Sequence, residues 1–103
     1  MRLTHPDTSI TVLHLSHTLD SESSHTFRQL VRQALEAKPT TLALDMTELT
    51  YIDSTGLGLL ALTRTEAERI GCAVTLANVP NGHPRKVLEL MKFDQMFPTT
   101  YAA

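Results

Sequence analysis

The sequence has a single cysteine, Cys72, so no disulfide can form within the chain, which fits a reducing compartment. It has few aromatic residues, no basic stripe and a formal net charge of −2, which argues against a nucleic-acid-binding protein. The longest apolar run, residues 57–62, is far shorter than the roughly 18–20 residues of a membrane span. The N-terminal residues lack the apolar segment of a signal peptide. We therefore expect a cytoplasmic protein that binds no nucleic acid and is not inserted in a membrane.

The length and composition are typical of one small globular domain. The chain has 103 residues, of which 42 % are hydrophobic and 19 % are charged. A chain of this length can bury one core, and neither an internal repeat nor a linker divides it. We therefore expect a single domain over residues 1–103.

Apolar periodicity predicts three strands and three helices that alternate along the chain. The strands are expected at residues 9–15, 40–45 and 72–79. The helices are expected at residues 24–37, at residues 55–70 with Gly71 as a stop signal, and from Asn81-Gly82-His83-Pro84 onwards. Residues 17–24 are interpreted as a loop that ends in a helix cap, and residues 93–101 as a tail without assignable structure.

The predicted helices differ in how much of their surface is apolar. The first has a single apolar face, formed by Phe27, Leu30, Val31, Ala34 and Leu35. The first half of the second is apolar on nearly all sides, so we expect it to be buried between other elements. The buried face of the third is expected to consist of Val87, Leu88 and Met91. Because no further apolar helix face is left over, we expect the free protein to be a monomer.

The alternation of strands and helices predicts an α/β fold. Crossovers through a helix normally join parallel strands with a right-handed turn. With one helix after each strand, the simplest packing is a small sheet with its helices largely on one side.

The most informative segment is the break before the second helix, which reads Tyr-Ile-Asp-Ser-Thr-Gly-Leu-Gly over residues 51–58. Either Asp53 or Ser54 could be the helix N-cap, a role that contributes about 1 kcal/mol. A helix needs only one such residue, yet three capping-competent residues follow one another here. Gly56 and Gly58 lie in the first turn, where each costs roughly 0.5–1 kcal/mol relative to alanine, and they would leave the Ser54 hydroxyl accessible.

An accessible hydroxyl at a helix start is suited to modification. A phosphate on Ser54 would add a charge of about −1.5 to −2 and would meet a favourable helix dipole. It would also lie beside Asp53, so its effect on a bound partner would be repulsive and steric. The segment therefore favours a switch at an interface.

Other chemistries have weaker support. The nucleophile elbow Gly-x-Ser-x-Gly lacks its first glycine here, and nothing places a histidine beside Ser54 as a base. The phosphate-binding pattern Gly-x-x-x-x-Gly-Lys-Ser/Thr is absent, although nucleotide binding at the helix start stays open. His14 and His17 are three residues apart, but on a strand-to-loop stretch rather than on a helix, and Cys72 is interpreted as a small buried hydrophobe. We expect no catalytic residue, no cofactor and no metal site.

Residues 42–58, which read LALDMTELTYIDSTGLG, closely resemble the core motif of STAS domains, the sulphate-transporter and anti-sigma-factor-antagonist family. Leu19-Asp20 is similar to the family's Leu-Asp pair, and residues 87–97 are similar to its third helix and C-terminal segment. The resemblance runs from about residue 8 to residue 98 and implies a mostly parallel sheet of about four to five strands covered by about three to four helices. His17 departs from the family pattern, which commonly has glycine there.

Stand-alone chains of this size resemble bacterial anti-sigma factor antagonists. In that branch an anti-sigma factor that is also a serine kinase phosphorylates the antagonist and releases it, and a PP2C-type phosphatase resets the switch. The resemblance implies that Ser54 is the phosphoacceptor, while modification of Thr55 stays open. The partner-binding residues that it implies are Asp20, Ser21, Asp53, Thr55, Gly56, Leu57 and Gly58.

A second interpretation comes from another branch of the same family. STAS-like chains also serve as accessory subunits of membrane-associated ABC-type ATPases, where the same helix end would dock without phosphorylation. In both interpretations the chain is a binding module rather than an enzyme, because Ser54 is at most a substrate.

Overall fold

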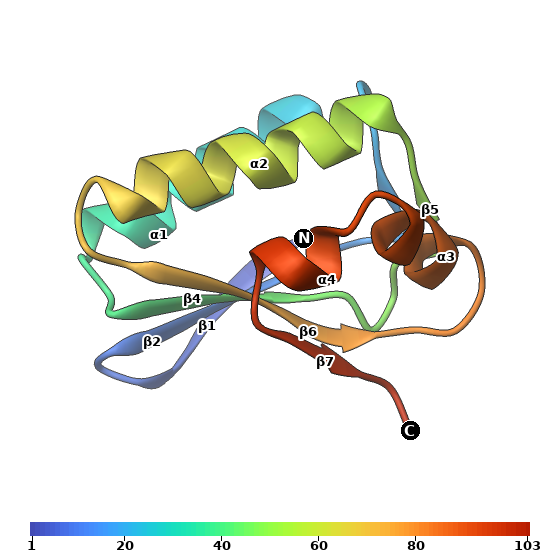
Figure 1. Cartoon of the computed structure of the whole chain (residues 1–103). Helices are drawn as coiled ribbons and strands as arrows, with labels where there is room; N and C mark the ends of the chain where they lie inside the picture. Colours follow the sequence, from blue (N-terminus) through green and yellow to red (C-terminus); the bar gives the residue numbers. More distant parts are fainter.

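A computed structural model describes residues 1–103 and contains a five-stranded sheet in the order β1-β2-β4-β6-β7 (Figure 1). Its strands are β1 (Arg2–Asp7), β2 (Ile10–His14), β4 (Thr41–Asp45), β6 (Ala73–Val79) and β7 (Thr99–Tyr101). Neighbouring strands from β2 to β7 are parallel, whereas β1 is antiparallel to β2. Two short parallel strands, β3 (Thr18–Leu19) and β5 (Tyr51–Ile52), form a separate ladder. The predicted α/β fold with a mostly parallel sheet is confirmed.

The helices cover one face of this sheet. They are α1 (Ser24–Glu36), α2 (Ser54–Glu68), α3 (His83–Leu90) and the single-turn α4 (Phe93–Met96). Helices α1 and α2 lie side by side above the strands, and α3 lies next to β5 (Figure 1). Side chains in β2 and β4 alternate between fully buried, as at Leu13 and Leu44, and half-buried, as at Val12 and Ala43. One hydrophobic core therefore lies between the sheet and the helices, while the other face of the sheet is open.

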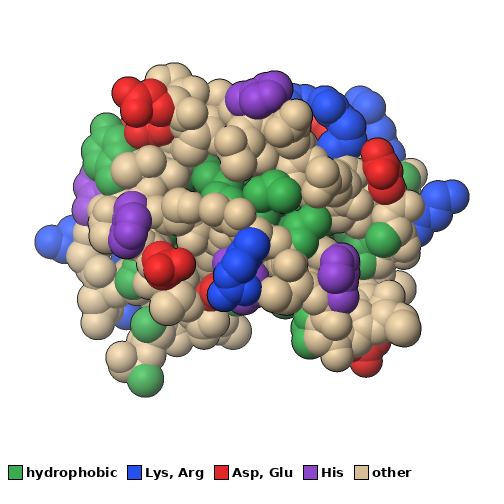
Figure 2. Space-filling view, turned by 180° about the vertical axis from the view of Figure 1, so that it is seen from behind, with side chains coloured by type: hydrophobic (Ala, Val, Ile, Leu, Met, Phe, Trp, Pro, Cys, Tyr) green, Lys and Arg blue, Asp and Glu red, His purple; other side chains and the backbone are tan.

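On the face seen from behind, Lys and Arg side chains gather at the upper right, and the other charged side chains are scattered (Figure 2). Hydrophobic side chains form a band between the helix layer and the sheet, and acidic, basic and histidine side chains surround it (Figure 2). Met1, Leu3 and Leu30 are partly buried against the core. No helix of the protein combines the length and the hydropathy needed to cross a membrane.

The three predicted helices exist, but two of their buried faces were predicted incorrectly. Only one side of α2 faces the core, because the helix lies in the outer layer, so Gly58 is exposed and Leu62 is 38 % exposed. Met91 is 51 % exposed rather than buried. Helix α3 ends one residue before it, and the left-handed backbone of Lys92 (φ 60°) turns the chain so that Phe93 enters the core instead.

Sequence patterns also missed five short elements. Strand β1 is polar and contains Pro6, which an edge strand tolerates because one side of its backbone is free. Strands β3 and β5 have two residues each and exist only through their mutual pairing. The segment interpreted as a tail forms α4 and β7, the latter adding to the edge of β6.

A chain of polar side chains crosses the sheet, and each strand contributes one member. The Thr4 hydroxyl bonds to Nε2 of His14 at 2.7 Å, and Nδ1 of His14 donates to Oδ2 of Asp45 at 2.8 Å. Nδ2 of Asn78 donates to Oδ1 of Asp45 at 3.0 Å, and the Asn78 backbone N–H donates to the Thr100 hydroxyl at 3.1 Å. The side chain of Asp45 therefore connects both halves of the sheet.

Hydrogen bonds outweigh burial in setting the pKa of Asp45. Burial raises this pKa, but donors on Asn78, Thr47 and His14 together hold it below the usual aspartate value. Since the pKa is lower in the folded protein than in the unfolded chain, ionised Asp45 stabilises the fold above the ordinary aspartate pKa. This stabilisation is lost as the pH falls through the folded-state pKa.

We predict that Asp45→Asn lowers the free energy of unfolding at neutral pH by roughly 1–3 kcal/mol, since it removes hydrogen bonds to a charged acceptor. Urea unfolding at decreasing pH should show the two proteins converging as the pH falls below the ordinary aspartate range. Glu48→Gln, in the adjacent exposed loop, is the control and should follow the wild type throughout. A constant difference between Asp45→Asn and wild type at every pH would contradict the role of the ionised form.

Candidate functional site

The β3–β5 ladder sets the position of the site. Leu19 pairs with Ile52 in parallel register, so the residues that follow them, Asp20 and Asp53, leave the ladder at the same end. Strand β5 leads through Asp53 directly into α2, whereas β3 leads into α1 through the loop of residues 20–23. The structure therefore brings together the two acidic positions that the sequence separates by more than thirty residues.

Asp53 is the N-cap of α2, which decides between the two candidates for that role. Its backbone is extended (φ −119°, ψ −170°), and its Oδ1 accepts the N–H of Gly56 at 3.0 Å. Its carbonyl oxygen accepts the N–H of Leu57 at 2.9 Å. Ser54 is thus the first helical residue, it is exposed, and no hydrogen bond of the chain uses its hydroxyl.

The two glycines of the motif have different functions. Gly56 is buried, and a Cβ there would overlap the carbonyl oxygen of Leu19 and lie 2.7 Å from Cγ1 of Ile52. The expectation that Gly56 keeps the hydroxyl accessible is therefore wrong, because this glycine allows α2 to approach the β3–β5 ladder. A Cβ at Gly58 would meet nothing within 4 Å, so Gly58 leaves an open surface on the first turn of α2.

The carboxylate of Asp20 organises its own loop. Its Oδ1 accepts the backbone N–H groups of Glu22 at 3.1 Å and of Ser23 at 3.2 Å. The predicted helix cap at the end of this loop is not formed by a side chain, because the Ser23 hydroxyl donates to the Thr18 carbonyl at 3.1 Å. Ser21 is exposed at the tip of the loop.

A stacked pair borders the site and was missed by the sequence patterns. The rings of Tyr51 and His83 stack at 5.0 Å with an interplanar angle of 7°. Nε2 of His83 donates to the carbonyl oxygen of Ile52 at 3.0 Å, which ties the start of α3 to β5. Because 31 residues separate the donor from this acceptor, no local pattern could have indicated the contact.

The arrangement presents a hydroxyl that no other side chain contacts by a hydrogen bond. Ser54, Thr55 and Gly58 form an exposed surface, Leu57 and Asp53 are half-buried beside it, and Asp20 and Ser21 lie on the neighbouring loop. His83, at the start of α3, is bonded to the Ile52 carbonyl. The first N–H groups of a helix have no intrahelical acceptor, so this end of α2 favours an anionic group.

Fold and site together define a small, mostly parallel α/β domain that displays the start of one helix. The chain belongs to the STAS domain family, whose pattern matches residues 3–103. It is also 36 % identical over 59 residues to the STAS-domain containing protein PA14_20770 of Pseudomonas aeruginosa, and the matching segment spans 57 % of each chain.

Solved structures share the fold. The unphosphorylated anti-sigma factor antagonist SpoIIAA superposes with a TM-score of 0.72 and 23 % identity, over 99 % of this chain and 88 % of that one. An anti-sigma factor antagonist from Mycobacterium paratuberculosis gives a TM-score of 0.83 and 20 % identity, over 99 % of this chain and 84 % of that one. The phosphorylated form of SpoIIAA from Bacillus gives a TM-score of 0.71 and 22 % identity, over 99 % of this chain and 90 % of that one.

We predict opposite outcomes for alanine at the two glycines. Gly56→Ala should lower the free energy of unfolding by about 1–3 kcal/mol, as expected for an overpacked contact. Gly58→Ala should leave it unchanged or raise it by roughly 0.5–1 kcal/mol, because alanine is the better helix former. Urea unfolding of both variants checks this, and equal destabilisation by the two would contradict the close approach at Gly56.

Proposed function

We propose that this chain is an anti-sigma factor antagonist in a phosphorylation-controlled partner switch. The unmodified protein binds an anti-sigma factor that is also a serine kinase, phosphorylation of Ser54 releases it, and a PP2C-type phosphatase restores binding. The observation that carries the proposal is the exposed Ser54 hydroxyl, which no hydrogen bond occupies at a helix start that Asp53 already caps.

Geometry supports Ser54 as a phosphoacceptor in three ways. The hydroxyl is accessible, and its modification breaks no contact within the chain. The fold around it is fixed by Asp53 and by the close contact at Gly56, so a kinase would meet a preformed surface. The open surface at Gly58 would let a partner approach the backbone of α2. These features suit a substrate of another enzyme.

Electrostatics explains how phosphorylation would weaken binding. The phosphate would add a charge of about −1.5 to −2 at a surface that already contains Asp53 and, on the adjoining loop, Asp20. The helix dipole would tolerate this charge, so the fold should survive. A partner that packs closely on the first turn of α2 would lose both space and charge complementarity.

The comparisons support the same proposal. The fold is that of non-enzymatic regulatory domains of the SpoIIAA type, and SpoIIAA itself has been solved in an unphosphorylated and a phosphorylated form. Ser54 lies at the start of α2 with no histidine bonded to it, so the proposal assigns no catalysis to this chain.

We predict that Ser54→Asp weakens binding of the kinase partner roughly 30- to 150-fold, equivalent to about 2–3 kcal/mol, while the melting temperature stays near that of wild type. The measurement is affinity capture from native cells followed by titration of the captured kinase. Thr65→Asp is the matched control, because it adds the same charge about three turns further along α2. Equal binding of wild type and Ser54→Asp would contradict the switch.

Phosphopeptide mass spectrometry on the protein from its native cells tests the modification itself. We expect phosphate on Ser54 that rises and falls with growth or stress, because the switch must be reset. The spectra also distinguish Ser54 from Thr55. An unmodified residue 54 under all conditions, together with capture of an ABC-type ATPase, would instead identify a constitutive accessory subunit.

A further inference from the structure

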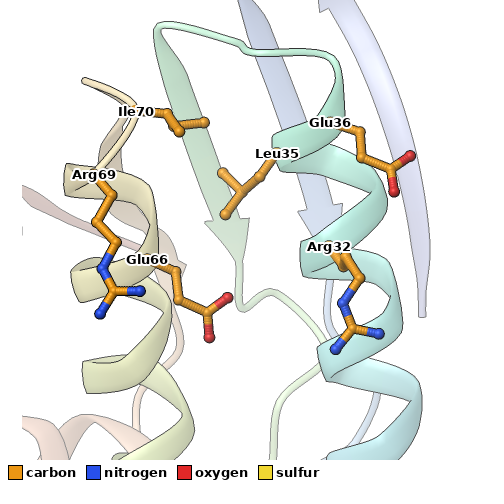
Figure 3. Close-up of a pocket in the computed structure, with 6 residues that line it drawn as sticks. All are labelled: Arg32, Leu35, Glu36, Glu66, Arg69 and Ile70. Atoms are coloured by element: carbon orange, nitrogen blue, oxygen red, sulfur yellow. The ribbon is translucent and has the colours of Figure 1, made fainter.

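The C-terminal ends of α1 and α2 enclose a groove that the site at Ser54 does not include. Its volume is about 340 Å³. It is lined by Arg32, Leu35, Glu36, Glu66, Arg69 and Ile70 (Figure 3). Because α2 has 15 residues, the groove lies about 20 Å from Ser54 along the helix.

The floor of this groove is apolar and accessible. The side chains of Leu35 and Ile70 point toward one another between the two helices (Figure 3). Ile70 is 43 % exposed, and Leu62, two turns before it on α2, is 38 % exposed. The expectation of a monomer assumed that no apolar helix face is left over, but Leu62 on α2 and Ile70 just beyond its end are exposed.

The charged residues of the groove have opposite signs on its two sides, at two levels along the helices. Nearer the helix ends, Arg69 lies on the α2 side and Glu36 on the α1 side, and about one turn earlier Glu66 lies on the α2 side and Arg32 on the α1 side (Figure 3). The salt bridges of the chain leave Arg69, Arg32 and Glu36 without a partner, and Glu66 has only a long contact of 3.4 Å with Arg28. The charges around the groove are therefore available to an external partner.

This arrangement is complementary to a second copy of itself. A two-fold axis parallel to the helices exchanges the α1 and α2 sides and keeps each level, so Arg69 would face Glu36 of a second copy, and Glu66 would face Arg32 of that copy. Each contact would occur twice, as in every isologous interface. The same operation would place the Leu35 and Ile70 side chains of both copies near the axis.

We infer that the groove is a homodimer interface in which α1 and α2 of one chain pack on α2 and α1 of another. The occupant is a second copy because the unpaired charges of this groove are complementary to those of the same groove turned by the two-fold axis. The contact is small, which places it among weak and transient interfaces. Both Ser54 surfaces would stay free, so the dimer would display two switch sites at once.

Sedimentation equilibrium over micromolar to millimolar concentrations at low salt tests the inference. We expect a reversible dimer that dissociates more readily at high salt, because exposed ion pairs are screened. Arg69→Glu and Glu36→Arg should each weaken self-association at least about tenfold, equivalent to about 1.4 kcal/mol, by placing like charges opposite one another. Lys86→Glu on α3 changes the charge as much as Arg69→Glu does and should have no such effect.

The decisive sample is an equimolar mixture of the Arg69→Glu and Glu36→Arg proteins. Across the proposed axis, each altered residue of one protein faces an opposite charge on the other, so the mixture should associate although neither protein does so alone. This outcome also shows that both variants are folded. A wild type that stays monomeric at millimolar concentration, or a mixture that does not associate, would overturn the inference. Since no kinase is present, neither result affects the proposal for Ser54.

Discussion

The structure depends on the close approach of α2 to the β3–β5 ladder at Gly56. The absence of a side chain there lets the helix contact the Leu19 carbonyl and the Ile52 side chain. The ladder in turn fixes where Asp20 and Asp53 leave their strands. From the sequence, Gly56 looks like a residue that keeps the surface open, but in the structure it is where α2 contacts the ends of β3 and β5. The position of Ser54 follows from this contact.

The residue that caps α2 and the residue that exposes its hydroxyl at the start of α2 are different neighbours in the chain. Asp53 satisfies the helix start, Ser54 has no structural task, and Gly58 keeps the next part of the turn uncovered. A residue without intramolecular partners can change its charge at little cost to the fold. In the proposed switch, stability and regulation would therefore belong to different side chains at the start of one helix.

Elements with strong local periodicity could be predicted from the sequence. The three long helices and the central strands were found because their apolar residues repeat over many positions. Strands β3 and β5 have no such repeat, since two residues per strand show no pattern and only their mutual pairing makes them strands. The same limit applies to the site: the motif located Ser54, but the contact of Gly56 with Leu19 and the bond from His83 to Ile52 join distant segments.

The polar chain through Asp45 has a consequence for the edges of the sheet. Through His14 and Thr4 it reaches the outer strand β1, and through Asn78 and Thr100 it reaches the other outer strand, β7. Outer strands present free backbone groups to which other chains can add, the usual route to aggregation. The Asp45 carboxylate in the middle of the sheet therefore helps to hold both edge strands in place. Protonation of this carboxylate at low pH would weaken the attachment of both edge strands together.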